Sequence, residues 1–107
     1  MKADKINLLR ISLLRAKLEA KKYINVDDGG SSNWDTPVLL LGSEWTDEML
    51  SRAFELTGLR PYRINKSTIH VLGAVEGQGI RRTAMAEAFR DCMRSLGYEA
   101  YVYYQTD

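Results

Sequence analysis

The order of helix-like and strand-like segments is the feature that most limits what this 107-residue chain can fold into. Residues 1–25 have a helical pattern, and residues 38–105 then read as strand, helix, strand, strand, helix, strand. This βαββαβ order is typical of a ferredoxin-like α+β fold, in which helices pack on an antiparallel sheet. We therefore predict a single domain over residues 1–107. Enzymes, regulators and nucleic-acid binders share this fold, so the fold alone predicts no activity.

The N-terminal helix is predicted to have two apolar surfaces. Residues spaced by three and four form a seam typical of helix–helix contacts. The seam consists of Ile6, Leu9, Leu13, Ala16 and Ala20, and a second apolar set consists of Leu8, Ile11, Leu14 and Leu18. A helix this widely apolar needs more than one surface to pack against. The sheet face opposite the other two helices is one such surface, and the sequence leaves open which face the helix covers. A homodimer through the seam stays open as an alternative to a monomer.

Local signals place the remaining elements. Val38–Leu41 is aliphatic throughout, as expected of a central strand that is covered on both faces. Thr46 is the predicted N-cap of a helix that stops at Gly58. A hairpin, a long helix and an edge strand follow, at Pro61–Ile64, Thr68–Gly73, Ile80–Leu96 and Tyr98–Gln105.

Composition favours a cytoplasmic protein without a membrane segment. Cys92 is the only cysteine, so no disulfide can form within the chain. The longest aliphatic run, Val38–Leu41, is far too short to span a membrane, and the basic N-terminal helix is unlike a signal peptide.

Charge is unevenly distributed, although the net charge is only +1. Residues 1–26 carry seven basic and two acidic side chains, a net charge of +5. Residues 27–55 carry one basic and seven acidic side chains, a net charge of −6. The two segments either face each other or form patches for a charged partner.

The polar loop before the first strand is the main candidate for partner binding. Its candidate residues are Asp27, Asp28, Ser31, Ser32, Asn33, Trp34 and Asp35. Loops often carry binding residues, but this one is also explained as a turn that leads into the strand. Its oxygens suit a hard cation, yet the bidentate Glu of an EF-hand is missing, so no metal site is predicted.

A second candidate site binds anions or nucleic acid. Gly77 and Gly79 precede the last helix, and Arg81 and Arg82 lie in its first turn, where free N–H groups favour a phosphate. Arg90 and Arg94 extend the basic groups along the helix, where they can track a phosphate backbone. No Walker or dinucleotide motif is present. Ordinary loop geometry and a solvated helix face are the alternatives.

No set of residues indicates catalysis or a cofactor. His70 is the only histidine and is expected to be a partly buried strand residue, while Cys92 falls on the predicted core face of the last helix. The C-terminal tyrosines offer stacking surfaces for bases, and half of them are expected on the outer face. An RNA-recognition module has its aromatic residues on the first and third strands, which lack them here.

Three motifs carry a resemblance to a known group. The segments DDGGSSNWD (residues 27–35), GQGIRR (77–82) and YYQTD (103–107) resemble those of small uncharacterised proteins of bacterial phages and mobile elements. The resemblance implies an accessory protein that acts inside a bacterial host cell. Such proteins often bind and block host defence machinery, including CRISPR effectors.

These observations give three functional hypotheses. The leading one is a non-enzymatic protein that binds a macromolecular partner, most simply another protein, as an inhibitor of a bacterial defence system. The second is nucleic-acid binding through the basic N-terminal helix and the Arg81–Arg94 stripe. The third is a small phosphate-binding protein or enzyme that uses Gly77–Arg82.

Overall fold

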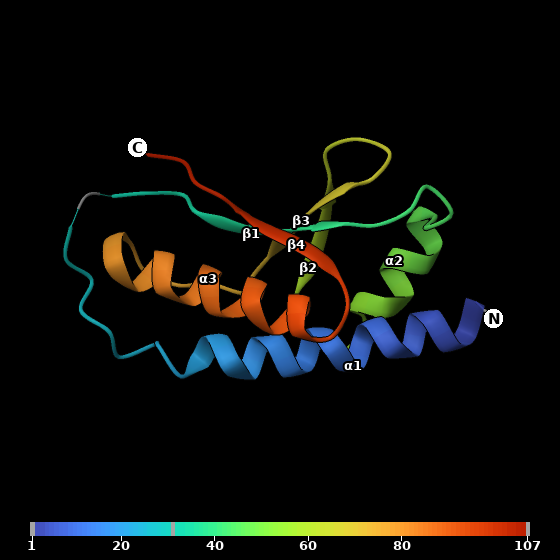
Figure 1. Cartoon of the computed structure of the whole chain (residues 1–107), viewed down its shortest axis with the longest axis horizontal. Coiled ribbons are helices and arrows are strands. Elements are labelled where there is room, and N and C mark those ends of the chain that lie inside the picture. The colour runs from blue at the N-terminus through green and yellow to red at the C-terminus, as the bar shows by residue number, and fades with distance from the viewer. Residues whose placement is uncertain (1, 31, 107) are drawn as a thin grey trace.

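The structure, a computed structural model, describes residues 2–30 and 32–106. It confirms the α+β class and the predicted order of elements. The elements are α1 (Lys2–Lys21), β1 (Thr36–Leu40), α2 (Asp47–Phe54), β2 (Arg60–Arg63), β3 (Thr68–Leu72), α3 (Gly79–Ser95) and β4 (Glu99–Tyr103). The molecule is elongated, with extents of 44 × 25 × 21 Å, and α1 runs along its length (Figure 1).

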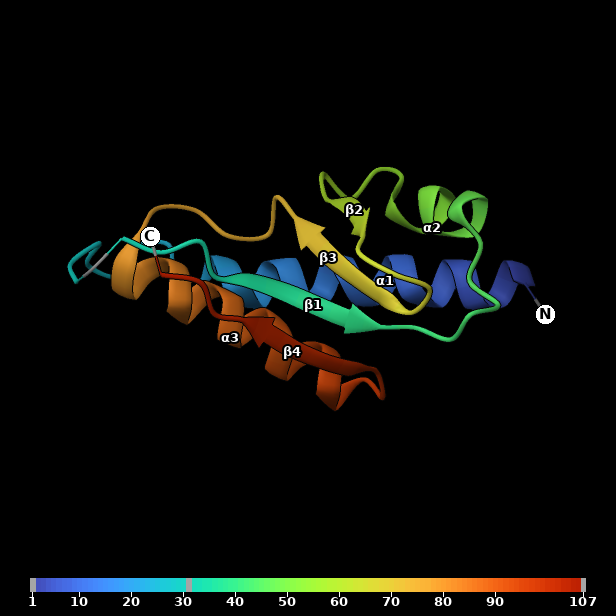
Figure 2. The ribbon, with the colours of Figure 1, turned by 90° about the horizontal axis from the view of Figure 1, so that it is seen from above.

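The four strands form one antiparallel sheet in the order β2-β3-β1-β4 (Figure 2). This is the strand order of a ferredoxin-like fold, with β1 inside the sheet and β4 at an edge, as the sequence predicts. Within the described ranges, no helix has both the length and the apolar character needed to span a bilayer.

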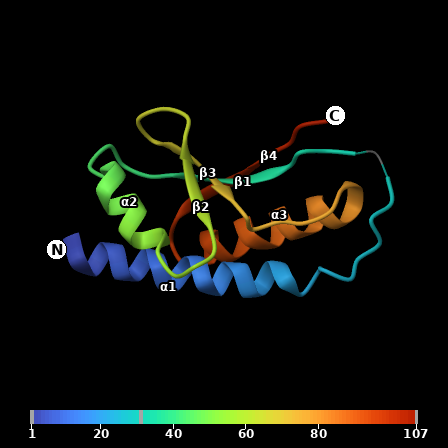
Figure 3. The same ribbon diagram turned by 180° about the vertical axis from the view of Figure 1, so that it is seen from behind.

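All three helices lie on the same side of the sheet, which decides the position that the sequence left open for the N-terminal helix (Figures 1 and 3). α1 packs against α2 and α3 instead of covering the opposite sheet face. Its seam residues Ile6, Leu9, Leu13, Ala16 and Ala20 are buried in one core with helix-facing strand residues such as Leu39 and Ile69. The predicted homodimer seam is therefore used inside the chain.

The apolar character of β1 has a different cause from the one predicted. Leu39 faces the helices, while Val38 points to the other side of the sheet and is nevertheless fully buried. His70 of β3 and Tyr101 of β4 are its register partners, so larger neighbours cover this small side chain. Strand neighbours thus bury Val38 on a face that no described helix covers.

Pro37 is the second residue of β1, although a proline donates no ladder hydrogen bond. The N–H of Leu41 donates to Ser67 O at 2.9 Å, so by alternation the nitrogen of Pro37 also faces the β3 side. The β1–β3 pairing begins only at Val38. Pro37 therefore interrupts no hydrogen bond of the sheet.

Thr46 caps α2 as predicted, because its hydroxyl accepts the N–H of Met49 at 3.2 Å. The helix ends earlier than expected, at Phe54. The buried Thr57 hydroxyl donates to Phe54 O at 2.6 Å and accepts the N–H of Leu59 at 3.0 Å. These two bonds replace a further helical turn and lead the chain into β2.

Candidate functional site

The two segments predicted as separate sites meet at the start of α3. The Asp28 carboxylate accepts the Gln78 N–H at 2.6 Å, and Gly29 O accepts the Ile80 N–H at 2.8 Å. These are the free N–H groups of a helix N-terminus that would otherwise favour an anionic ligand. The chain's own aspartate occupies that position.

The rest of the loop is fixed to α3 and β4. Asn33 donates to Gly79 O at 3.0 Å, and the Ser32 hydroxyl donates to Gln78 Oε1 at 2.7 Å. Asp35 is almost fully buried and accepts the Thr83 hydroxyl at 2.7 Å and the Gln105 N–H at 3.0 Å. Ser31 lies outside the described residues. Asp28, Ser32, Asn33 and Asp35 thus join secondary-structure elements, and Asp27 accepts the N–H of Gly29 within the loop.

The glycines before α3 permit this close contact. Gly79 has a φ of +57°, and a Cβ there would lie 2.0 Å from Gly29 O. Gly77 has a φ of +78°, and its Cβ would lie 2.8 Å from the Asp28 carboxylate. Only glycine fits both the left-handed backbone and the approach of the loop.

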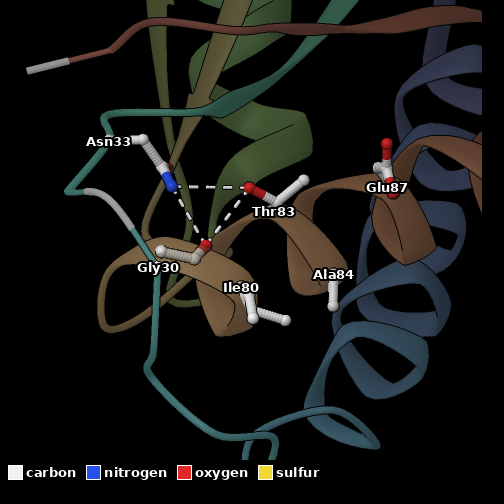
Figure 4. Close-up of a pocket in the computed structure, with 7 residues that line it drawn as sticks. Gly30, Asn33, Ile80, Thr83, Ala84 and Glu87 are labelled. Atoms are coloured by element: carbon white, nitrogen blue, oxygen red, sulfur yellow. Dashed lines mark hydrogen bonds between the residues drawn. The ribbon is translucent and has the colours of Figure 1, made fainter.

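A shallow hollow of about 370 Å³ lies where the loop meets α3 (Figure 4). It is lined by Gly30, Asn33, Gly79, Ile80, Thr83, Ala84 and Glu87. Asn33, Thr83 and Gly79 O satisfy one another by hydrogen bonds, shown as dashed lines in Figure 4. The one ionisable side chain among the lining residues is the acidic Glu87, so the hollow does not favour a phosphate.

The arginines of α3 hold neighbouring parts of the chain. Arg81 Nε donates to Val26 O at 2.9 Å, and Arg82 Nε donates to Asp35 O at 2.8 Å. Arg94 Nε donates to Ala100 O at 2.6 Å. Arg90 contacts Asp91 at 2.8 Å and Tyr104 Oη at 3.2 Å, and these hydrogen bonds raise its pKa. Burial lowers the pKa of Arg82, which Asp35 partly offsets.

Two ion pairs join the basic residues 1–26 to the acidic residues 27–55. Lys5 lies 3.8 Å from Glu44, and Arg10 lies 3.9 Å from Glu55, so both pairs join α1 to the acidic segment. These exposed pairs add little stability. They do reduce the field that either segment presents to a charged partner.

The residues that the structure describes form no metal centre. They contain no group of three or more His, Cys, Asp or Glu side chains arranged to hold a metal ion. Cys92 is half-buried, and burial raises the pKa of its thiol, which disfavours the reactive thiolate.

The uncovered side of the sheet, which we call the open sheet face, is rich in aromatic residues. Strand alternation places eleven side chains there. They are Thr36, Val38, Leu40, Arg60, Tyr62, Thr68, His70, Leu72, Glu99, Tyr101 and Tyr103. Tyr62 is 57% exposed, Tyr103 is 44% exposed and Tyr101 is 36% exposed. No helix of the described chain covers these rings.

His70 lies between two of these tyrosines. Its ring centroid is 5.4 Å from that of Tyr103 and 6.4 Å from that of Tyr62, the latter in an edge-to-face arrangement. Burial lowers the pKa of His70, which favours the neutral ring. Trp34, in the loop before β1, is 53% exposed, and the Arg82 guanidinium lies 5.7 Å from its ring centroid. The face therefore offers flat rings with few charges.

The sequence pointed to the C-terminal tyrosines as stacking surfaces for bases but did not include any residue of the open sheet face among the candidate site residues. In β4, Tyr101 and Tyr103 alternate with the small buried residues Ala100 and Val102. Such alternation places the tyrosines on one face and the small residues in the core. The contribution of His70 and Tyr62 depends on strand pairing, which the local pattern does not reveal.

No protein-family model, curated protein or solved structure matches this chain. The structure by itself defines an α+β protein of ferredoxin-like topology with an aromatic open sheet face.

Proposed function

We propose that this chain is a non-enzymatic binding protein that holds a protein partner on its open sheet face. The observation that carries the proposal is the exposure of Tyr62, Tyr101 and Tyr103 on a face that no described helix covers. Tyrosine contributes large apolar area and a hydroxyl, and it is enriched in the residues that dominate protein interfaces. Leu40, which is partly exposed beside Thr68 and Glu99, adds aliphatic area to this face.

The charge of the open sheet face favours protein over nucleic acid. Among its strand residues Arg60 is the only permanent cation, and Glu99 offsets it. Neutralisation of phosphates by Lys and Arg supplies most of the affinity for nucleic acid of any sequence. The predicted stripe does not compensate, because Arg81, Arg82 and Arg94 donate to backbone carbonyls of the chain itself.

The resemblance to small phage and mobile-element proteins suggests what kind of protein is bound. We propose a component of a bacterial defence system, such as a CRISPR effector, with the chain as its inhibitor. Expression of the protein in a bacterium with an active CRISPR system should restore plasmid or phage survival. Unchanged interference across several CRISPR types would contradict the inhibitor part of the proposal and leave the binding part standing.

Replacement of exposed rings tests the binding surface. A variant with Tyr62→Ala and Tyr103→Ala should lose at least tenfold in affinity for the captured protein, since it removes two anchors of the face. The measurement is a pulldown from nuclease-treated bacterial lysate, followed by titration with the identified protein. Tyr23→Ala is the matched control, because Tyr23 is 42% exposed but follows α1, away from the sheet. Equal affinity of the ring variant and the wild type would exclude this face.

The Asp27–Asp35 loop is a competing binding surface, and a substitution at Asp27 distinguishes it from the open sheet face. Asp28 and Asp35 cannot be reversed cleanly, because their carboxylates hold the start of α3 and the end of β4. Asp27 is exposed, and its carboxylate accepts the N–H of Gly29 within the loop. Asp27→Lys should leave partner binding unchanged if the sheet face binds, and should abolish it if the acidic loop does.

Single-stranded nucleic acid is the second candidate ligand. The adjacent rings of His70 and Tyr103 form the kind of platform on which bases stack. Anisotropy of a labelled oligonucleotide should then rise on addition of protein and fall steeply between about 50 and 200 mM salt. No anisotropy change at low salt would exclude this candidate.

A further inference from the structure

The side of α1 that faces away from the core is apolar along its middle turns. Leu8 is 58% exposed, Ile11 is 62% exposed and Leu18 is 65% exposed, and Leu14 adds a fourth exposed aliphatic side chain. Spacings of three and four residues place them on one stripe, opposite the buried seam of Leu9, Leu13 and Ala16. We call these four residues the α1 stripe. Figures 1 and 3 show α1 at the boundary of the molecule, with no described element beyond it.

The ends of the α1 stripe carry opposite charges. Asp4 lies in the first turn of α1, and Lys21 lies in its last turn, with Lys22 directly after it. Among the described residues, neither Asp4 nor Lys21 forms an ion pair within the chain. Lys22 lies 2.9 Å from Glu19 at an exposed position. The stripe is therefore apolar in the middle, acidic at one end and basic at the other.

From this pattern we infer that the α1 stripe binds a second copy of the chain, with the two α1 helices antiparallel. An antiparallel alignment about the middle of the helix sets Leu8 against the partner's Leu18, and Ile11 beside the partner's Leu14. It also brings Asp4 to the partner's Lys21 and Lys22, twice in the symmetric dimer. This surface lies across the helical layer from the open sheet face, so the dimer leaves the proposed partner surface free.

The parallel alignment is disfavoured by the same charges. It would set Asp4 against Asp4, Arg15 against Arg15, and the two lysines against their own copies. In the antiparallel alignment Arg15 lies near the partner's Ile11, where its methylene groups cover that side chain while its charge stays in water. A single helix pair is a small interface, so the dimer should be weak, with dissociation at micromolar concentrations.

Sedimentation equilibrium of the full chain tests the dimer. The wild type should be largely dimeric at about 100 µM, and Ile11→Glu should weaken association at least tenfold, because it places a charge in the apolar stripe. Leu56→Glu is the matched control, since Leu56 is 92% exposed and lies outside α1. Circular dichroism verifies that both variants remain folded. A wild-type monomer at this concentration, or equal effects of the two variants, would overturn the inference.

Charge exchange and cross-linking test the orientation. Lys21→Glu with Lys22→Glu should weaken the dimer, and the addition of Asp4→Lys should restore it.

In a Cys92→Ala background, Leu8→Cys and Leu18→Cys chains should form disulfides with each other when mixed. Leu8→Cys alone should not, because ten residues of helix hold the two thiols about 15 Å apart. Disulfides of Leu8→Cys with itself would overturn the antiparallel alignment. Neither outcome depends on the open sheet face.

Discussion

At the scale of single residues, side chains that look functional in the sequence are used to hold the fold. Asp28 and Asp35 are the clearest cases, since each joins the loop to an element about fifty residues or more away. The sequence could reveal the residue types and the glycines beside them. It could not reveal these contacts, because the residues next to an aspartate in the sequence do not determine which distant N–H its carboxylate accepts.

Removal of the Asp28 carboxylate should destabilise the protein. Asp28→Ala takes away the acceptor of the Gln78 N–H and a negative charge at the start of α3, with an expected cost of about 1 kcal/mol in the free energy of unfolding. Urea denaturation measures the change. Asp27→Asn is the control and should cost less than about 0.5 kcal/mol, because the amide oxygen still accepts the Gly29 N–H. Equal stability of Asp28→Ala and the wild type would contradict the capping role.

His70 should make stability depend on pH. Burial lowers its folded-state pKa below the ordinary 6.5, so the unfolded chain binds the proton more readily. The stability gained by burying the neutral ring is fully present above the pKa that His70 has in the unfolded chain. It is lost as pH falls through the lower pKa of the folded state. NMR titration of the imidazole should give a pKa below 6.5, and the free energy of unfolding should fall between about pH 7.5 and 5.5. His70→Gln should reduce this dependence of the free energy of unfolding on pH. An unchanged dependence would show that other groups cause it.

At the scale of elements, local signals predicted the order of helices and strands but not all of their faces. Caps, turns and alternation act within a few residues, which is why Thr46 and the hairpin around Asn65 were found. The predicted core face of α3 included Cys92, yet Met93 is fully buried and Cys92 only half-buried. The face that α3 buries depends on where α1 lies. Because α1 is apolar on most sides, its sequence does not determine which elements it packs against.

The N-cap of α2 offers a test at this scale. Thr46→Ala should reduce the free energy of unfolding by about 1 kcal/mol, because the Met49 N–H loses its acceptor. Thermal and urea unfolding measure the loss. Thr46→Ser keeps the hydroxyl and should recover most of the stability, whereas no recovery would show that the methyl group, not the cap, is what matters.

At the scale of the whole molecule, opposite charges lie together and rings remain exposed. The Lys5–Glu44 and Arg10–Glu55 ion pairs join the basic α1 to the acidic segment, so part of the opposite charge is paired within the chain. Three helices cover one side of the sheet and leave the aromatic side uncovered within the described chain. The number of helices could be read from the sequence, but their placement on one side is a property of the assembled fold. The uncovered side is what makes partner binding the central proposal.

The most direct test of that proposal is an NMR map of the complex with the captured protein partner, on isotope-labelled chain. The account predicts that amide signals of β1, β2, β3 and β4, together with the His70 ring, shift or broaden on titration, while those of the Asp27–Asp35 loop and the α1 stripe change little. A footprint centred on the loop or on α3, with the sheet signals unaffected, would contradict it.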